Sequence, residues 1–202
     1  MTTSLITLII LSVFVLLGLA TMALKDFKMG TITTFVLIAL VILANFIPPI
    51  TIGILTFRIG TVLFYGFCLT LFFVKGKGSN RGIAFLITII LAGLLYGSIA
   101  LATLFNNAYF SNINLIYAIG LGLLALVFTK NAKYAFISSA IAILINTIIL
   151  QIGGQINIGA GFEWAVLTSS ISVVLYGILS TAQTKPSKMS YYFESGRLRD
   201  ED

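Results

Sequence analysis

The stretch Ile50–Val74, ITIGILTFRIGTVLFYGFCLTLFFV, is an apolar run long enough to cross a bilayer, and its one charged residue is Arg58. If the run forms one helix, Arg58 lies eight residues from its start. At about 1.5 Å of rise per residue, this places the guanidinium about 12 Å along the helix axis. An arginine at mid-membrane costs about 2.5 to 3.5 kcal/mol on insertion scales. The stretch therefore predicts a membrane helix whose arginine needs a partner.

The composition of the whole chain points to lipid as its solvent. Of 202 residues, 59% are apolar and 9% are charged, and the mean hydropathy is +1.10. Such a chain has too few polar side chains to enclose a soluble globule. Its net charge of +6 comes from short basic runs between apolar segments. These runs indicate topology-setting charge, so we predict no nucleic-acid partner.

The residue types that are missing exclude several kinds of chemistry. The chain has no histidine, which removes His-dependent triads, imidazole metal sites and histidine proton relays. Cys68 is the only cysteine, so an intrachain disulfide is excluded, and no base lies near it in the sequence pattern. We therefore predict a protein that is not an enzyme and has no catalytic residue, metal site or cofactor. An intramembrane enzyme is the weakest of the functional alternatives.

Apolar segments separated by basic or polar turns predict an all-α polytopic membrane protein. We expect one transmembrane domain over residues 1–182 and a cytoplasmic C-terminal tail over 183–202. The turn before the third span is marked by Pro48 and Pro49, which cannot continue a helix. A version with six spans and a re-entrant segment is the alternative. The seven predicted spans are Ser4–Leu24, Thr31–Phe46, Ile50–Val74, Ile83–Phe105, Leu115–Thr129, Tyr134–Gln151 and Trp164–Ala182.

The distribution of lysine and arginine predicts the orientation of the spans. With the N-terminus outside and the C-terminus cytoplasmic, eleven of the twelve basic residues fall in cytoplasmic segments. The exception is Arg58. Because cytoplasmic loops carry an excess of basic residues, the opposite orientation is disfavoured. The predicted location is the cell (plasma) membrane, with several passes through the bilayer.

A spacing shared by two basic turns suggests an internal repeat. Lys25 and Lys28 recur as Lys130 and Lys133 at an offset of 105 residues. If this is a repeat, spans one to three and five to seven are parallel three-helix units joined by the fourth, a 3+1+3 arrangement. Coincidence among apolar segments of similar length is the alternative. Small carriers with two parallel repeats, such as the SWEET and PQ-loop sugar carriers, are similar in helix count, orientation and size, although their proline-glutamine motif is absent here.

Two charged residues near the predicted outer face are candidates for a binding site. Glu163 is the only acidic residue at the outer ends of the spans, so it is the available partner for Arg58. A pair would reduce the cost of burying either charge, and both are expected to line an outward-facing cavity that binds a polar or anionic group. The alternatives are structural. Arg58 then reaches the lipid headgroups, and Glu163 complements the dipole of its helix N-terminus.

Other polar and small residues extend this hypothesis. Asn146 and Gln151, in the sixth span, are expected near one face, where they bind a solute or a neighbouring helix. Serine and threonine in spans six and seven are expected to pack. The Gly93-x-x-x-Gly97 motif predicts a close helix crossing, either within the bundle or in a homodimer. Four glycines within Gly153–Gly161 suit a mobile lid or an irregular connection.

Taken together, these features predict a membrane carrier, or a substrate-binding membrane component, for a small polar or anionic solute. The solute would be captured in the outer half of the bundle at Arg58, Glu163, Asn146 and Gln151. Rocking of the two three-helix units about the fourth span would then move it. The alternative is a non-catalytic integral subunit or scaffold of a larger membrane complex, which would dock other membrane proteins through residues 191–202. In either case the lipid bilayer is a partner.

Overall fold

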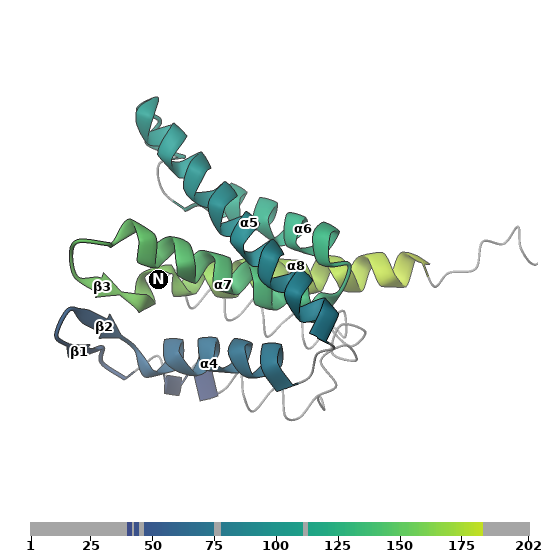
Figure 1. Cartoon of the computed structure of the whole chain (residues 1–202), viewed down its shortest axis with the longest axis horizontal. Helices are drawn as coiled ribbons and strands as arrows, with labels where there is room; N and C mark the ends of the chain where they lie inside the picture. The colour runs from purple at the N-terminus through teal and green to yellow at the C-terminus, as the bar shows by residue number, and fades with distance from the viewer. Residues whose placement is uncertain (1–39, 42, 45–46, 75–77, 111–112, 184–202) are drawn as a thin grey trace, which may run out of the picture.

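The computed structural model describes residues 40–41, 43–44, 47–74, 78–110 and 113–183. The predicted first span, most of the second and the tail after residue 183 lie outside these residues. The described part is mostly helical, with a small sheet at one end (Figure 1). Its elements are β1 (Ile50–Ile52), β2 (Leu55–Phe57), α4 (Ile59–Val74), α5 (Gly78–Leu104), α6 (Leu115–Thr129), α7 (Ala132–Leu150), β3 (Ile156–Asn157), the 3-10 helix η1 (Ile158–Gly161) and α8 (Phe162–Gln183).

The prediction of one continuous helix over Ile50–Val74 is wrong. The first part of the stretch is a β-hairpin in which β1 and β2 pair antiparallel, and α4 begins only at Ile59. The hairpin turns at Gly53, which has a φ of +60° at the first central position, where type II′ turns place glycine. Alternating isoleucine and threonine, which favour strands, precede this turn. Apolar length alone did not distinguish this hairpin from the first turns of a helix.

The glycine-rich connection after α7 also contributes to the sheet. β3 pairs parallel to β2, with Leu55 opposite Ile156 and Thr56 opposite Asn157. The Ile156 N–H donates to the carbonyl oxygen of Ile54 at 2.8 Å. The strand order is β1-β2-β3, so the hairpin before α4 is joined to the loop between α7 and α8. We call β1, β2, β3, η1 and the adjoining ends of α4, α7 and α8 the sheet end of the bundle.

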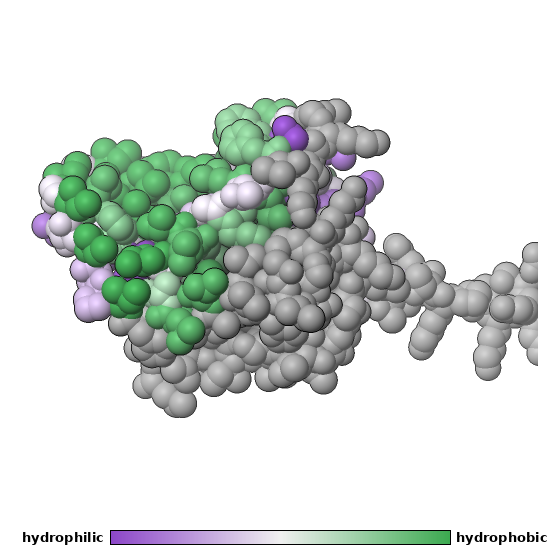
Figure 2. Space-filling view, turned by 90° about the horizontal axis from the view of Figure 1, so that it is seen from below, coloured by the Kyte–Doolittle hydropathy of each residue, from purple (hydrophilic) through white to green (hydrophobic). Residues whose placement is uncertain are grey.

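Three of the helical segments are long and apolar enough to cross a membrane: Asn80–Leu104, Ala132–Leu150 and Ile158–Ser180. They correspond to the predicted fourth, sixth and seventh spans. The helices α4 and α6 are also apolar but shorter, at 16 and 15 residues. Large apolar side chains are exposed on every described α-helix, and Figure 2 shows hydrophobic residues gathered over one face. A helical membrane protein is expected to have such a surface, because lipid solvates it.

Local capping explains why α6 and α7 are separate helices. Lys130 ends α6 in the left-handed conformation with a φ of 50°, and its N–H donates to the carbonyl of Leu126 at 2.8 Å. Asn131 then caps α7, because its side-chain oxygen accepts from the N–H of Tyr134 at 3.2 Å. Two local capping interactions therefore form this predicted basic turn, which reverses the chain within two residues.

The helix α7 lies at the centre of the described bundle and packs against α8, α5, α6 and α4 (Figure 1). Small side chains make this possible. Fully buried positions on α7 include Ala135, Ser138, Ser139, Ala140 and Ala142. Small residues let helix backbones approach closely where lipid supplies no hydrophobic driving force between helices.

The helices α6 and α8 pack closely at Gly122. A Cβ there would lie 3.0 Å from the carbonyl oxygen of Thr168 and 3.1 Å from Cγ2 of Ile171. We expect Gly122→Ala to lower the free energy of unfolding by about 1 to 2 kcal/mol, since the overpacking cost exceeds the gain in helix propensity. The change in unfolding free energy is measured by titration with sodium dodecyl sulfate in detergent micelles. The matched control is Gly120→Ala, because a Cβ at Gly120 meets nothing within 4 Å. Equal stability of the two variants would contradict this packing.

The Gly93-x-x-x-Gly97 motif does not produce the predicted close crossing within the described bundle. A Cβ at Gly93 or at Gly97 would meet nothing within 4 Å. Gly93 is exposed and Gly97 is half-buried on α5. The predicted contact with a second copy of the chain stays a prediction.

Candidate functional site

Arg58 is not embedded in a helix as the sequence predicted. It follows β2 directly, its side chain is exposed, and its carbonyl oxygen accepts from the N–H of Val62 at 3.2 Å in the first turn of α4. The eight residues before it form the hairpin and turn rather than two helical turns. Arg58 therefore marks the start of the helix, and the predicted burial about 12 Å along it does not occur.

Glu163 lies at the same end of the molecule, half-buried in the first turn of α8. The pairing of β2 with β3 accounts for this proximity, because Arg58 follows β2 and Glu163 follows the strand and 3-10 helix paired to it. The structure contains no ion pair between these two residues, both of which it describes. A negative charge in the first turn of a helix interacts favourably with the helix dipole. This is the structural role that the sequence offered as the alternative to a binding role for Glu163.

Gln151 holds the connection between α7 and α8. It is the C-terminal cap of α7, and its side-chain oxygen accepts from the N–H of Asn157. Its side-chain nitrogen donates to the carbonyl of Asn157 at 3.4 Å. The expectation that Gln151 shares a face with Asn146 is wrong, because five residues rotate a helix by about 140°. Both ends of the Gln151 amide are engaged with this loop.

Asn146 has a different environment. Its side chain is 0% exposed, and neither its Nδ2 nor its Oδ1 has a hydrogen-bond partner among the residues that the structure describes. The fully buried Ala135, Ser139 and Ala142 precede it at spacings of eleven, seven and four residues, which place all four on one face of α7. A primary amide with this burial normally finds partners, so Asn146 is the most informative polar residue of the described core.

Two hydroxyl groups on α4 share this property and were missed from the sequence. Thr61 is 0% and Tyr65 5% exposed, and within the described ranges neither the Thr61 Oγ1 nor the Tyr65 hydroxyl has a hydrogen-bond partner. They lie four residues apart, hence on one face of α4. In the sequence, these two residues could have been found as a pair of hydroxyl side chains four positions apart in an apolar segment.

The sheet end joins α4 to α7 through η1. A Cβ on Gly159 would lie 3.8 Å from Oγ1 of Thr61, and one on Gly161 would overlap Oγ1 of Thr147. The η1 backbone therefore lies against a threonine of each helix, and at Gly161 only a glycine leaves room for this contact. Phe64 of α4 stacks edge-to-face on Phe162 at 5.5 Å between ring centroids, closing the same region with apolar area.

Most other buried hydroxyls in the described helices are satisfied by backbone carbonyls, as expected for packing residues. Ser138 donates across to the Ala84 carbonyl of α5 at 3.2 Å. The remaining bonds lie within one helix: Thr88 to Ala84, Ser139 to Phe136, Thr168 to Trp164, Ser169 and Ser170 to Val166, and Ser172 to Ser169. These groups have no need of a further partner, in contrast to Asn146, Thr61 and Tyr65.

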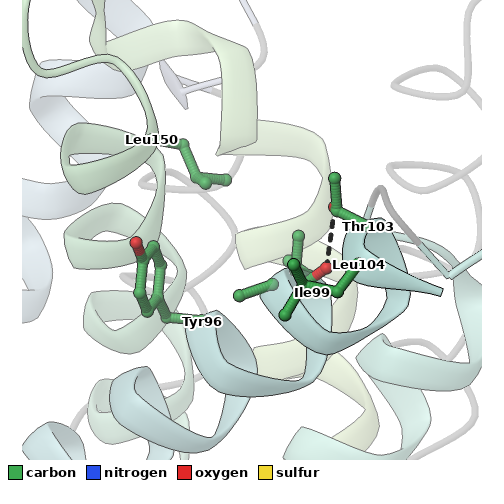
Figure 3. A pocket seen from close by; sticks show the side chains of 6 residues that line it. Tyr96, Ile99, Thr103, Leu104 and Leu150 are labelled. Carbon is green, nitrogen blue, oxygen red and sulfur yellow. Dashed lines mark hydrogen bonds between the residues drawn. The ribbon is translucent and has the colours of Figure 1, made fainter. Parts of the chain in front are cut away.

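An open groove of about 370 Å³ lies between α5 and the end of α7. In Figure 3, Tyr96 and Leu150 face each other across it, and Ile99, Thr103 and Leu104 form the far side. The Thr103 hydroxyl donates to the Ile99 carbonyl at 2.9 Å, so it is turned back onto its own helix. The walls are therefore mainly apolar. Leu150 is four residues, or about one helical turn, after Asn146, which does not itself line the groove.

Within the described ranges, no group of three or more histidine, cysteine, aspartate or glutamate side chains could hold a metal ion. Cys68 is buried and not in a disulfide. Comparison with protein-family models, with curated proteins and with solved structures finds no match to this chain.

Proposed function

We propose that this chain is an integral membrane protein that binds a small polar solute inside its bundle, near the sheet end. It would act as a carrier or as the substrate-binding component of one. The observation that carries the proposal is Asn146, a fully buried amide without a hydrogen-bond partner in the described part of the chain. Thr61 and Tyr65 add two further buried hydroxyls of the same kind at the same end.

The energetics of Asn146 favour binding over helix adhesion. A buried donor or acceptor left without a partner costs about 1–3 kcal/mol. Adhesion would remove this cost through a hydrogen bond to a neighbouring helix, as Ser138 makes to α5. Asn146 makes no such bond in the structure. A group kept at this cost is explained if another molecule, a polar solute, supplies the hydrogen bonds.

The charges of the described helices support a site in the outer half of the membrane. Arg81, Lys130 and Lys133 lie at the start of α5 and the turn before α7, at the opposite end from the sheet. Under the positive-inside rule this end is cytoplasmic and the sheet end is outside. Arg58 and Glu163 would then lie at the outer mouth of the site. Because α4 meets α7 and β2 meets η1 there, rocking of α4 against α6–α8 would open and close it.

The alternative, a non-catalytic subunit of a membrane complex, is favoured by the exposed Gly93 and the half-buried Gly97, at neither of which a Cβ would contact the described bundle. The two functions differ in what they require of Asn146. A solute site must be reached from water at some point in its cycle, whereas the core of a scaffold need not be.

Cysteine labelling tests this difference. The single cysteine makes Cys68→Ala a cysteine-free background, into which Asn146→Cys is introduced. We expect a membrane-impermeant methanethiosulfonate reagent to label this variant from outside intact cells and more slowly from inside-out vesicles. The control is Ser139→Cys, two turns away on α7 at a position whose hydroxyl is satisfied, and it should stay unlabelled. Absence of labelling at position 146 from both sides would favour the subunit.

A further inference from the structure

The buried polar groups without partners near the sheet end are all uncharged. Asn146 offers two N–H donors and a carbonyl acceptor, and Thr61 and Tyr65 each offer a hydroxyl that donates and accepts. These groups complement hydroxyl, carbonyl and amide groups. None of them neutralises a charge.

Of the charged residues that the structure describes, Lys133 lies far from Asn146, whereas Arg58 and Glu163 lie at the sheet end itself. Lys133 is buried in the first turn of α7, thirteen residues from Asn146, and so about 20 Å away along the axis. Its Nζ lies 5.1 Å from the centre of the Tyr134 ring. Arg58 is exposed at the surface of the sheet end, and Glu163 is half-buried there. An anion transferred to Asn146 would lose its hydration without gaining a cation, which costs far more than transfer of a neutral group.

The groove between α5 and the end of α7 provides an apolar surface. Its volume of about 370 Å³ is in the range of small-molecule sites, and its walls are mainly the apolar side chains of α5 with Leu150 (Figure 3). Ile99, 3% exposed, lies at its base and packs into the core. An apolar portion of a solute fits this groove, and Asn146 lies one helical turn before Leu150 on α7.

Resting on the function proposed above, we infer that the solute is a neutral molecule. Its hydroxyl or amide groups would bind Asn146, and an apolar portion would occupy the groove between α5 and α7. Carboxylates and phosphates are disfavoured substrates. The inferred class of solutes is narrower than the one expected from the sequence. That class included anions, because the sequence predicted Arg58 inside the membrane.

Matched neutral and anionic probes test the inference. The full chain in nanodiscs is titrated with nicotinamide against nicotinate and with benzamide against benzoate. Binding is followed by the thermal midpoint and by the fluorescence of Trp164, the only tryptophan, which is half-buried in the first turn of α8. We expect at least one amide to bind at least about tenfold more tightly than its acid, because only the acid brings an uncompensated charge. This binding should be lost in Asn146→Leu, weakened in Ala100→Phe, which fills the groove, and kept in Ser139→Ala.

The possible outcomes separate this inference from the proposed function. Tighter binding of the acids, lost in Arg58→Gln and kept in Asn146→Leu, would overturn the neutral class while leaving a solute-binding protein. Absence of a response to all four probes would also overturn it, and the cysteine labelling at position 146 would then decide the proposed function independently. Binding of an amide that persists in Asn146→Leu would show that the groove and not Asn146 is the site, which also contradicts the inference.

Discussion

Asn146→Leu is expected to raise the free energy of unfolding of the solute-free protein by about 1–3 kcal/mol. The substitution removes a fully buried amide that has no hydrogen-bond partner in the structure, and it replaces the amide by an apolar group of similar size. The measurement is unfolding in detergent micelles by sodium dodecyl sulfate, with the wild type in the same micelles. The sign of the change in unfolding free energy is the informative result, because most substitutions in a protein core lower the stability.

The matched control is Ser139→Ala on the same face of α7. Its hydroxyl is also fully buried but donates to the Phe136 carbonyl at 3.1 Å, so its removal should change stability little or lower it. A loss of stability in Asn146→Leu would show that the amide stabilises the bundle, and adhesion between helices would replace binding as its role. A gain would indicate that the chain keeps a destabilising residue for its function.

Gly161→Ala is expected to lower the free energy of unfolding by about 3 kcal/mol, at the upper end of typical overpacking costs. A Cβ at Gly161 would overlap Oγ1 of Thr147 and lie 3.1 Å from Cγ2 of Ile143. Both residues are buried on α7, so neither can move without displacing the helix against η1. The same titration measures the loss. The substitution should also loosen the sheet end, which would be detected as faster hydrogen exchange over residues 156–161.

A second substitution identifies the cause of this loss. Thr147→Ala removes the atom that the new Cβ would overlap, so the double variant Gly161→Ala, Thr147→Ala should be more stable than the sum of the single changes predicts. Gly154→Ala is the control within the same connection, because its nearest neighbour would be the Gln151 carbonyl at 3.9 Å. Additive effects at 161 and 147 would show that η1 is not held against α7 as described.

The charged residues show how a correct location can follow from an incorrect structure. Arg58 and Glu163 were expected at one end of the bundle, and the pairing of β2 with β3 does bring their segments together. The sequence predicted a helix that starts at Ile50, whereas α4 starts at Ile59. Because the turn at Gly53 permits a hairpin, the apolar run is divided between sheet and helix, and Arg58 remains exposed.

The polar residues show the limit of spacing arguments. Asn146 and Gln151 looked alike in the sequence, as two amides near the end of one apolar segment. In the structure, Gln151 binds the backbone of Asn157, while Asn146 is buried without a partner. Which amide is satisfied depends on where the loop after α7 returns, and that path is set by pairing with a strand a hundred residues earlier.

The sequence by itself determined that this protein is helical and apolar, and that helices cover the regions of the predicted fourth to seventh spans. These are local properties, because hydropathy, capping asparagines and basic turns act over a few residues. Only the tertiary structure decided where α4 begins, that β2 pairs with β3, and which buried polar groups lack a partner. Strand pairing and the satisfaction of hydrogen bonds depend on residues distant in the chain, which no local pattern records.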